Sequence, residues 1–277
     1  MRSMAHFTGV LGWPLDHSLS PAIHNAAFRN VGLDWVYLAW PVRPEELPAA
    51  IGGLRALGAQ GANVTMPHKE TVIEHLDEVS GDARRVGAVN TIQRVGDDLV
   101  GHNTDVDGFR SFLVDDAGVD PSGKNVLVLG SGGAARAVVC ALDDLAAARI
   151  VIAARREDRG REIAGLASRP VVEVAGWKDT GEIAAASDLI VNATPVGMSG
   201  DTPLPNATWH PGQVVCDLVY SPPTTPLMES ARAGGAETWG GLGMLIHQAA
   251  LSFRIWTGQE PSVAAMSAAA VRAIGGL

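Results

Sequence analysis

The chain has 277 residues, of which 47% are apolar and 18% charged, and its formal net charge is −9. This length corresponds to one or two domains, and the apolar content argues against an intrinsically disordered chain. The acidic balance argues against a nucleic-acid partner, and no uncharged apolar run reaches the roughly 18 residues that a membrane span needs.

In the first third of the chain, apolar runs alternate with helical patterns. Ser20 followed by Pro21 predicts a helix with serine at the N-cap and proline at the first helical position. Gly96-Asp97-Asp98 separates two apolar runs and predicts a hairpin. The predicted elements are strands over 7–12, 35–41 and 61–66, helices from 20, from 44 and over 67–76, and hairpin strands over 88–95 and 99–103.

The middle third has short apolar runs separated by glycine-containing turns and helical segments. This order is typical of a doubly wound parallel sheet. The predicted strands cover 125–129, 150–152, 171–174, 189–193 and 214–220, with helices ending near 145 and over 157–167, after a connector over 115–124. Two helices, over 242–256 and 263–274, end the chain; they are too short to form a domain and are predicted to pack on the N-terminal unit.

The strongest local signal is a glycine-rich turn between the predicted strand 125–129 and the helix that follows. Gly130, Gly132 and Ala135 fit the G-x-G-x-x-G/A pattern of dinucleotide-binding turns, in the strand-to-helix context that the pattern requires. Ser131, Gly133 and Ala134 complete the turn. Its backbone can approach a pyrophosphate at the helix N-terminus. The alternative is a glycine-rich turn that binds nothing.

The residues after the second strand of this unit favour NADP over NAD. An NAD site needs an acidic side chain there for the ribose hydroxyls. This chain has Ala154, Arg155 and Arg156, with Arg159 one helical turn later. Arginine is the preferred partner of a 2′-phosphate.

Polar clusters follow several strands of the first third. Asn63 and Thr65 share one strand face, and Lys69 follows a proline turn. Asn90-Thr91 and Asn103-Thr104-Asp105 also lie at predicted strand ends, which suggests a polyol-binding cleft. Ser18 and Ser20, at a helix start, could bind an anion. Taken singly, each cluster is weak evidence, because a lysine after a turn is usually a solvated surface residue.

Other site classes have no support in the sequence. The eight histidines show no i, i+4 pair and no metal-like spacing with cysteine, so no metal is expected. No Gly-x-Ser-x-Gly elbow occurs, so serine hydrolysis has no basis.

Together these residues resemble the shikimate dehydrogenase family. The resemblance is carried by a series of motifs in order along nearly the whole chain: Ser18-Leu19-Ser20-Pro21, Asn63-Val64-Thr65-Met66-Pro67-His68-Lys69, Gly87-Ala88-Val89-Asn90-Thr91, Gly101-His102-Asn103-Thr104-Asp105, Gly130-Ser131-Gly132-Gly133-Ala134-Ala135, Asn192-Ala193-Thr194-Pro195-Val196-Gly197-Met198 and Gly241-Leu242-Gly243-Met244-Leu245-Ile246-His247-Gln248-Ala249.

The resemblance implies a reversible, NADP-dependent reduction of 3-dehydroshikimate to shikimate in aromatic amino acid and chorismate biosynthesis. It implies that Ser18, Ser20 and Tyr220 hold the substrate carboxylate, and that Lys69 and Asp105 are the catalytic pair. The implied partners of the ring oxygens are Asn63, Thr65, Lys69, Asn90, Asp105 and Gln248. The implied cofactor-binding set is the turn Gly130–Ala135 with Ala154, Arg155, Arg156, Arg159, Thr194, Val196, Gly241 and Met244.

The implied chemistry suits these residue types. Hydride addition to a ring ketone builds negative charge on oxygen, and the Lys69 ammonium can stabilise that charge and supply a proton while Asp105 orients it. One departure concerns the cofactor: family members commonly have Asn-Arg-Thr where this chain has Ala154-Arg155-Arg156, which affects the strength of the NADP preference. Quinate or aminoshikimate as substrate, and a non-catalytic NADP(H)-binding sensor, stay open as alternatives.

The family's architecture implies an α/β fold in which a Rossmann-type doubly wound NADP-binding domain is inserted in an α/β substrate-binding domain. The expected parts are 1–106 for substrate binding, 107–238 for NADP, and 239–277 as helices that return to the substrate domain. With only Cys140 and Cys216, and no apolar leader at the N-terminus, we expect a soluble cytoplasmic protein, as a monomer or homodimer.

Overall fold

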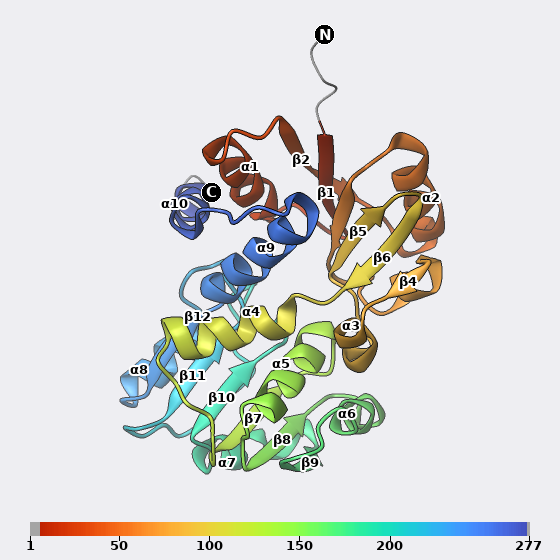
Figure 1. Cartoon of the computed structure of the whole chain (residues 1–277). Coiled ribbons are helices and arrows are strands. Elements are labelled where there is room, and N and C mark those ends of the chain that lie inside the picture. The colour runs from red at the N-terminus through yellow and green to blue at the C-terminus, as the bar shows by residue number, and fades with distance from the viewer. Residues whose placement is uncertain (1–5, 276–277) are drawn as a thin grey trace. The chain divides into compact units, whose positions relative to one another are not determined.

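The chain leaves one folded unit at Thr104 and returns to it at Ile246, and the intervening residues Asp105–Leu245 form a second unit. The computed structural model describes residues 6–275 (Figure 1). The two-unit α/β architecture predicted from the sequence is confirmed by this fold. Each unit is built on its own sheet.

The sheet of the split unit is mixed. Among the described residues its strand order is β2-β1-β3-β5-β6-β4, and β5 runs antiparallel to β3 and to β6. Its strands are β1 (His6–Gly12), β2 (Trp35–Pro41), β3 (Gly61–Val64), β4 (Glu78–Val79), β5 (Thr91–Val95) and β6 (Asp98–His102). Its helices are α1 (Ser20–Asn30), η1 (Pro44–Glu46), α2 (Leu47–Leu57), η2 (Thr71–His75), α3 (Gly81–Val86), α10 (Val263–Gly275) and most of α9 (Leu242–Thr257).

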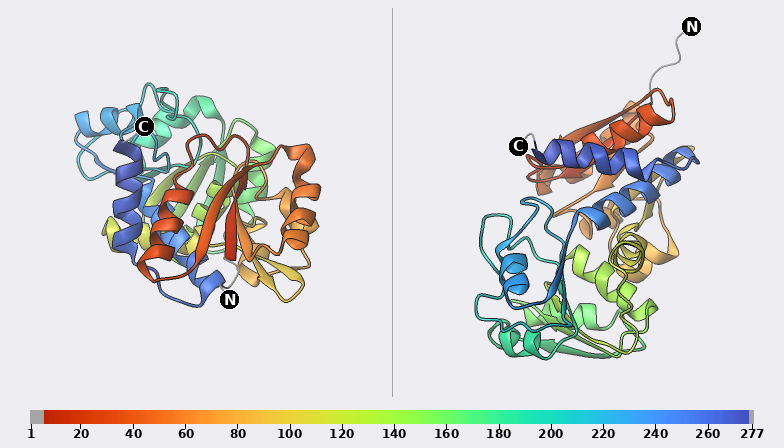
Figure 2. Two further views of the ribbon diagram at one scale, coloured as in Figure 1. Left: turned by 90° about the horizontal axis from the view of Figure 1, so that it is seen from above. Right: turned by 90° about the vertical axis from the view of Figure 1, so that its left-hand side faces the viewer.

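Sequence-distant helices cover this sheet. The apolar face of α2, with Leu47, Ile51 and Leu54, packs with Leu11 and Val64 of the strands in one buried cluster. On α1 and α9, aromatic rings of Phe28 and Phe253 lie 5.1 Å apart. Helices α1 and α10 contact each other, as both views of Figure 2 show. The C-terminal helices therefore pack with the unit that the N-terminal third begins.

The second unit has an all-parallel sheet. In the part of the chain that the structure describes, the strand order is β12-β11-β10-β7-β8-β9, a doubly wound arrangement in which the order reverses beside β7. The strands are β7 (Asn125–Leu129), β8 (Arg149–Ala153), β9 (Val171–Ala175), β10 (Leu189–Asn192), β11 (Val214–Asp217) and β12 (Glu237–Gly240). The helices are α4 (Asp105–Ser111), η3 (Phe112–Asp116), α5 (Gly133–Asp144), α6 (Glu157–Ala164), η4 (Trp177–Asp179), α7 (Thr180–Ala185) and α8 (Pro226–Ala233).

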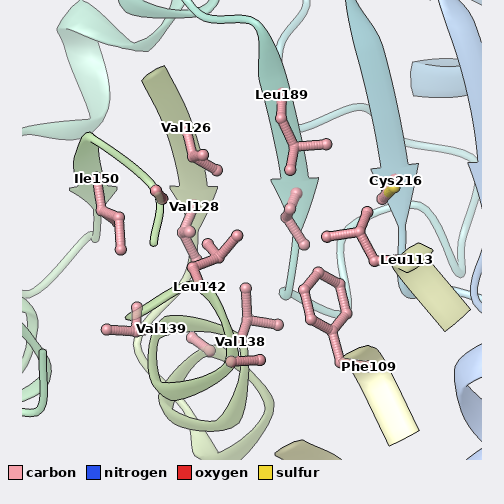
Figure 3. Close-up of a cluster of buried hydrophobic side chains, with 14 of the residues drawn as sticks. Phe109, Leu113, Val126, Val128, Val138, Val139, Leu142, Ile150, Leu189 and Cys216 are labelled. Atoms are coloured by element: carbon pink, nitrogen blue, oxygen red, sulfur yellow. The ribbon is translucent and has the colours of Figure 1, made fainter. Parts of the chain in front are cut away.

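Alternation along the strands gives this sheet two apolar faces. Val126 and Val128 join α4 and α5 in one buried cluster, whereas Leu127 and Leu129 join α7 and α8 in another. Figure 3 shows side chains of α5 directed at the first face. Because helices cover both faces of the sheet, the sequence of β7 is a continuous apolar run after Asn125.

Several predicted elements differ from the structure. Strand β3 ends at Val64 rather than at 66, and the predicted helix over 67–76 is reduced to the 3₁₀ turn η2, because the chain is held in a turn by His68 N–H donating to Thr65 O. Ser20 is the first residue of α1 rather than its N-cap; Leu19 holds the N-cap position, without a side-chain cap hydrogen bond. Part of the predicted connector over 115–124 is helical, since the π-helical turn η3 extends to Asp116.

Candidate functional site

Asn63 is the centre of a buried polar network in the split unit. Its side-chain nitrogen donates to Asn90 O at 3.1 Å, to Thr91 Oγ1 at 3.1 Å and to Ser252 Oγ at 3.0 Å. Its Oδ1 accepts a 2.7 Å bond from the hydroxyl of Tyr37. Four elements, β2, β3, β5 and α9, therefore determine the orientation of one amide.

Asn90 extends this network towards the end of β6. Its Oδ1 accepts a 2.8 Å bond from Thr104 N–H, and its Nδ2 donates to Thr104 Oγ1 at 2.9 Å. Nδ2 also lies 3.4 Å from Gln248 Oε1 of α9. Asn63, Asn90 and Gln248, three of the residues that the resemblance implies for the ring oxygens, are thus brought together by the fold, each 9% exposed or less.

Lys69 and Asp105 are both tied to this network through the backbone. Lys69 O accepts a 2.7 Å bond from the N–H of Val89, the residue before Asn90. Asp105 directly follows Thr104, whose N–H is held by Asn90. Lys69 is half-buried, and Asp105 is buried at the start of α4. The backbone of Lys69 is thus placed by its bond to Val89, and that of Asp105 by the bond between Thr104 and Asn90.

The other predicted substrate residues of the split unit lie near its strand ends and the start of α1. Thr65 and Ser18 are half-buried, and Ser20 is buried. Burial raises the pKa of Tyr37, and the Ser20 side chain acts in the opposite direction. Ser20 therefore lies beside the hydroxyl that holds Asn63. His68, which we did not predict as a ligand, has its Nε2 2.7 Å from Val42 O and so has a structural partner.

Sequence reasoning missed two members of the network. Tyr37 lies on β2, and Ser252 lies 189 positions after its partner Asn63. Ser252 Oγ is 2.8 Å from Thr91 Oγ1 and donates to Gln248 O at 3.0 Å. Neither residue sits in a recognisable motif. Only an inward-facing polar position in an otherwise apolar helix face could have indicated Ser252.

His24 of α1 is an unusual neighbour of this network. Its ring stacks on Tyr37 with 4.4 Å between centroids and 7° between planes, and it is fully buried. Within residues 6–275 neither ring nitrogen makes a hydrogen bond. Removal from water lowers the pKa of His24 to about 3, although the neighbouring Asn63 acts in the opposite direction. The imidazole is therefore neutral wherever the protein is folded at ordinary pH.

We expect His24 to make the free energy of unfolding fall with acid. The unfolded chain takes up a proton below pH 6.5, whereas the folded chain does so only near 3. The contribution of His24 to the free energy of unfolding is thus constant above pH 6.5. Between pH 6.5 and about 3 it declines by roughly 1.4 kcal/mol per pH unit. His24→Phe should remove that part of the decline, measured by urea unfolding across this range. His75→Gln, in η2, is the control and should keep the wild-type slope; equal slopes in all three proteins would contradict the assignment.

The glycine-rich turn of the second unit has the geometry that a pyrophosphate needs. Gly130 has φ +114°, which favours glycine, and Gly132 forms the N-cap of α5. A Cβ at Gly132 would meet no heavy atom within 4 Å, so the space above this backbone is open. Ala135 is fully buried where α5 crosses the strands. The residues present fit the diphosphate of a dinucleotide at a helix N-terminus.

The arginines after β8 are exposed or half-exposed. Arg155 and Arg156 lie at the surface, while Ala154 is 2% exposed and presents no polar side chain. Arg159 NH1 lies 3.0 Å from Glu162 Oε2. Arg155 thus has its charge available at the strand end, whereas Arg159 already has an acidic neighbour.

The remaining predicted cofactor and substrate residues follow β10, β11 and β12. Thr194 and Val196 are half-buried in the loop after β10. Tyr220 follows β11, and burial raises its pKa. Gly241 and Met244 are buried after β12. The ends of these parallel strands form the edge at which doubly wound sheets bind ligands.

Two findings concern other site classes. Among residues 6–275, no group of three or more His, Cys, Asp or Glu side chains is arranged to hold a metal ion. No helix in the described part of the chain is long and apolar enough to cross a membrane.

Comparison with known proteins gives one consistent result. A model described as the shikimate dehydrogenase substrate binding domain matches residues 10–92, and one described as the shikimate 5'-dehydrogenase C-terminal domain matches residues 241–271. Over 272 residues the chain is 44% identical to a shikimate dehydrogenase (NADP(+)) of Geobacter metallireducens, with 91% of each chain covered.

Solved structures agree over the whole fold. A shikimate dehydrogenase in complex with NADP+ superposes with a TM-score of 0.89 at 39% identity, covering 98% of this chain and 96% of that one. The enzyme of Thermus thermophilus in complex with NADP(H) and shikimate gives a TM-score of 0.86 at 37% identity, covering 97% and 99%.

Proposed function

This chain belongs to the shikimate dehydrogenase family, and from that membership we propose that it interconverts 3-dehydroshikimate and shikimate with NADP(H). It is an NADP-dependent oxidoreductase of the shikimate pathway. The main support from this chain's own residues is the buried network around Asn63 and Asn90. The backbones of Lys69 and Asp105 both adjoin this network.

In the split unit, we assign substrate binding to side chains that suit a polyhydroxylated carboxylate. The amides of Asn63, Asn90 and Gln248 offer both donors and acceptors to ring hydroxyls. Thr65 joins them, and Ser18 and Ser20 are assigned to the carboxylate. Tyr220, which belongs to the Asp105–Leu245 unit, is assigned to the carboxylate as well. This assignment is supported by the hydrogen bonds that fix the orientation of the buried Asn63 and Asn90 amides. Amide groups of fixed orientation can recognise the hydroxyl groups of a ring.

Lys69 and Asp105 are assigned the proton chemistry. When bound, NADP(H) supplies or accepts the hydride at the ring carbon. In the direction of reduction, the Lys69 ammonium stabilises the developing negative charge on the ring oxygen and is the source of its proton. Asp105 orients the ammonium, and in the reverse direction Lys69 takes the proton from the hydroxyl.

In the Asp105–Leu245 unit, we assign cofactor binding to the turn Gly130–Ala135 and the arginines after β8. The open space over Gly132 supports a diphosphate there, and Arg155, with Arg156 and Arg159, supports a 2′-phosphate. Ala154, Thr194, Val196, Gly241 and Met244 are assigned to the same site. We propose 1–106 with 239–277 as the substrate domain and 107–238 as the NADP domain; the folded units divide a few residues away, at Thr104 and Ile246.

The proposal also covers the compartment and the oligomeric state of the enzyme. Cys140 and Cys216 are both free thiols, which fits a reducing compartment, so we place the enzyme in the cytoplasm, as a monomer or homodimer. Its proposed partners are small molecules and not nucleic acid.

One assay tests the activity. Reduction of NADP+ and of NAD+ is measured with shikimate, quinate and aminoshikimate side by side, with reactions that lack enzyme as the control. We expect the highest kcat/KM for NADP+ with shikimate. A higher value with quinate or aminoshikimate would reassign the substrate. NADP+ binding without turnover of any of them would indicate a sensor rather than an enzyme.

A further inference from the structure

We propose that Asp217, at the end of β11, is the positioning residue of the cofactor-binding loop 193–196. The inference rests on the proposed function, because it assumes that Thr194 and Val196 face the cofactor. Asp217 is outside the predicted site and has no role in the proton chemistry. It acts through the side chain of Asn192 on the neighbouring strand.

The Asp217 carboxylate is completely buried and accepts three hydrogen bonds. Oδ1 accepts from Asn192 Nδ2 at 2.8 Å and from Val219 N–H at 3.1 Å, and Oδ2 accepts from Thr225 Oγ1 at 2.6 Å. Burial raises the pKa of Asp217, opposed by these same three bonds. A buried carboxylate is costly unless donors satisfy it. Asp217 therefore favours the one orientation of Asn192 and Thr225 in which their side chains donate to it.

Asn192 passes this constraint to the loop after β10. Asn192 and Asp217 are register partners on the parallel pair β10 and β11. Asn192 Oδ1 accepts from Thr194 Oγ1 at 2.6 Å and from Thr194 N–H at 3.1 Å, and its Nδ2 also donates to Val196 O at 2.9 Å. One amide thus holds both loop residues assigned to the cofactor. Its orientation depends on the carboxylate, which accepts from its nitrogen.

The loop held in this way lies against the glycine-rich turn. A Cβ on Gly130 would be 3.0 Å from Thr194 Cγ2 and 3.1 Å from Ala193 O. On the other side, a Cβ on Gly241 would collide with Leu218 O, and Gly241 N–H donates to Val219 O at 3.2 Å. The turns after β7, β10, β11 and β12 therefore abut. Thr194 is packed closely against Gly130, so it cannot move in that direction without displacing the glycine-rich turn.

Asp217→Asn tests this with an almost isosteric change. With its nitrogen towards Asn192 the new amide would set two donors against each other, and with its nitrogen towards Thr225 it would offer Asn192 Nδ2 a neutral oxygen in place of a carboxylate. In both orientations the Asn192 amide is held less firmly. We expect the Kd of NADP+, measured by calorimetry without shikimate, to rise about tenfold or more, with a parallel rise in KM for NADP+.

Asp143→Asn is the matched control. Asp143 is also a buried carboxylate of this unit, 4% exposed, and accepts from the backbone N–H groups of Ser168 and Arg169 at 3.0 and 2.8 Å. It lies at the C-terminal end of α5, away from the four turns. Asp143→Asn should lower the melting temperature while leaving the Kd of NADP+ within about twofold of wild type.

A pair at Thr225 tests the same carboxylate through its other oxygen. Thr225→Ser keeps the hydroxyl that donates to Asp217 Oδ2 and should bind NADP+ as wild type does. Thr225→Val removes it and should weaken binding, and this pair decides the matter should Asp217→Asn fail to fold.

The inference is overturned if folded Asp217→Asn binds NADP+ with the wild-type Kd, if Asp143→Asn weakens binding equally, or if the two Thr225 variants bind alike. A wild-type protein that neither binds NADP+ nor oxidises shikimate would instead overturn the proposed function.

Discussion

Replacing Lys69 with alanine is expected to lower kcat by roughly 10²–10⁴-fold, the usual range for a general acid–base group. The KM for shikimate should rise far less, because the amides of Asn63, Asn90 and Gln248 are hydrogen-bonded to one another and to Ser252 and remain in the variant. Steady-state kinetics with saturating NADP+ measures both constants.

Lys178→Ala is the control for this experiment. Lys178 is exposed on η4 and belongs to no assigned site, so its removal should leave kcat unchanged. Lys69→Arg keeps the positive charge but holds its proton too tightly to transfer it, and should recover only part of the loss. Near wild-type turnover in Lys69→Ala would remove this residue from the mechanism.

Replacing Arg155 with alanine is expected to weaken NADP+ about ten- to a hundredfold and leave NAD+ almost unaffected. A charge-assisted hydrogen bond is worth about 1.5–3 kcal/mol, which corresponds to that range of affinity. Only NADP+ carries the 2′-phosphate. Arg159→Ala should have the smaller effect, since its guanidinium is already 3.0 Å from Glu162. The measurement is kcat/KM for both cofactors in each protein.

Arg161→Ala is the matched control, because Arg161 is an exposed arginine on α6, the helix that follows Arg155, and is paired with Glu157 at 2.9 Å. It should alter neither cofactor. Because Ala154 is buried and supplies no polar group, we also expect the wild-type preference for NADP+ to be smaller than in relatives with asparagine there, though still in favour of NADP+. Equal weakening of both cofactors in Arg155→Ala would make the arginine structural.

The sequence by itself determined the central strands and the dinucleotide turn. β7, β8 and β10 are buried on both faces and therefore appear as short apolar runs, which can be recognised without a structure. The turn at Gly130 could be predicted because its positive φ demands glycine, which leaves a local pattern. The family also followed from such local patterns, and the comparisons confirm it.

Some local elements could not be predicted. The edge strands β4 and β12 are short and partly exposed, so they carry no apolar run, and the helix predicted over 67–76 gave way to a turn held by its own backbone bonds. In such segments tertiary contacts outweigh a weak intrinsic preference.

Only the tertiary structure decided which polar groups meet. Asn63 and Ser252 are 189 positions apart, and Asn192 and Asp217 meet because β10 and β11 pair in register. A hydrogen bond of this kind is made by the packing of whole elements and leaves no spacing in the sequence. The motifs therefore give the candidate residues of the site. The orientation of each amide is set by partners that no motif contains, because buried polar groups must be satisfied by whatever the fold brings beside them.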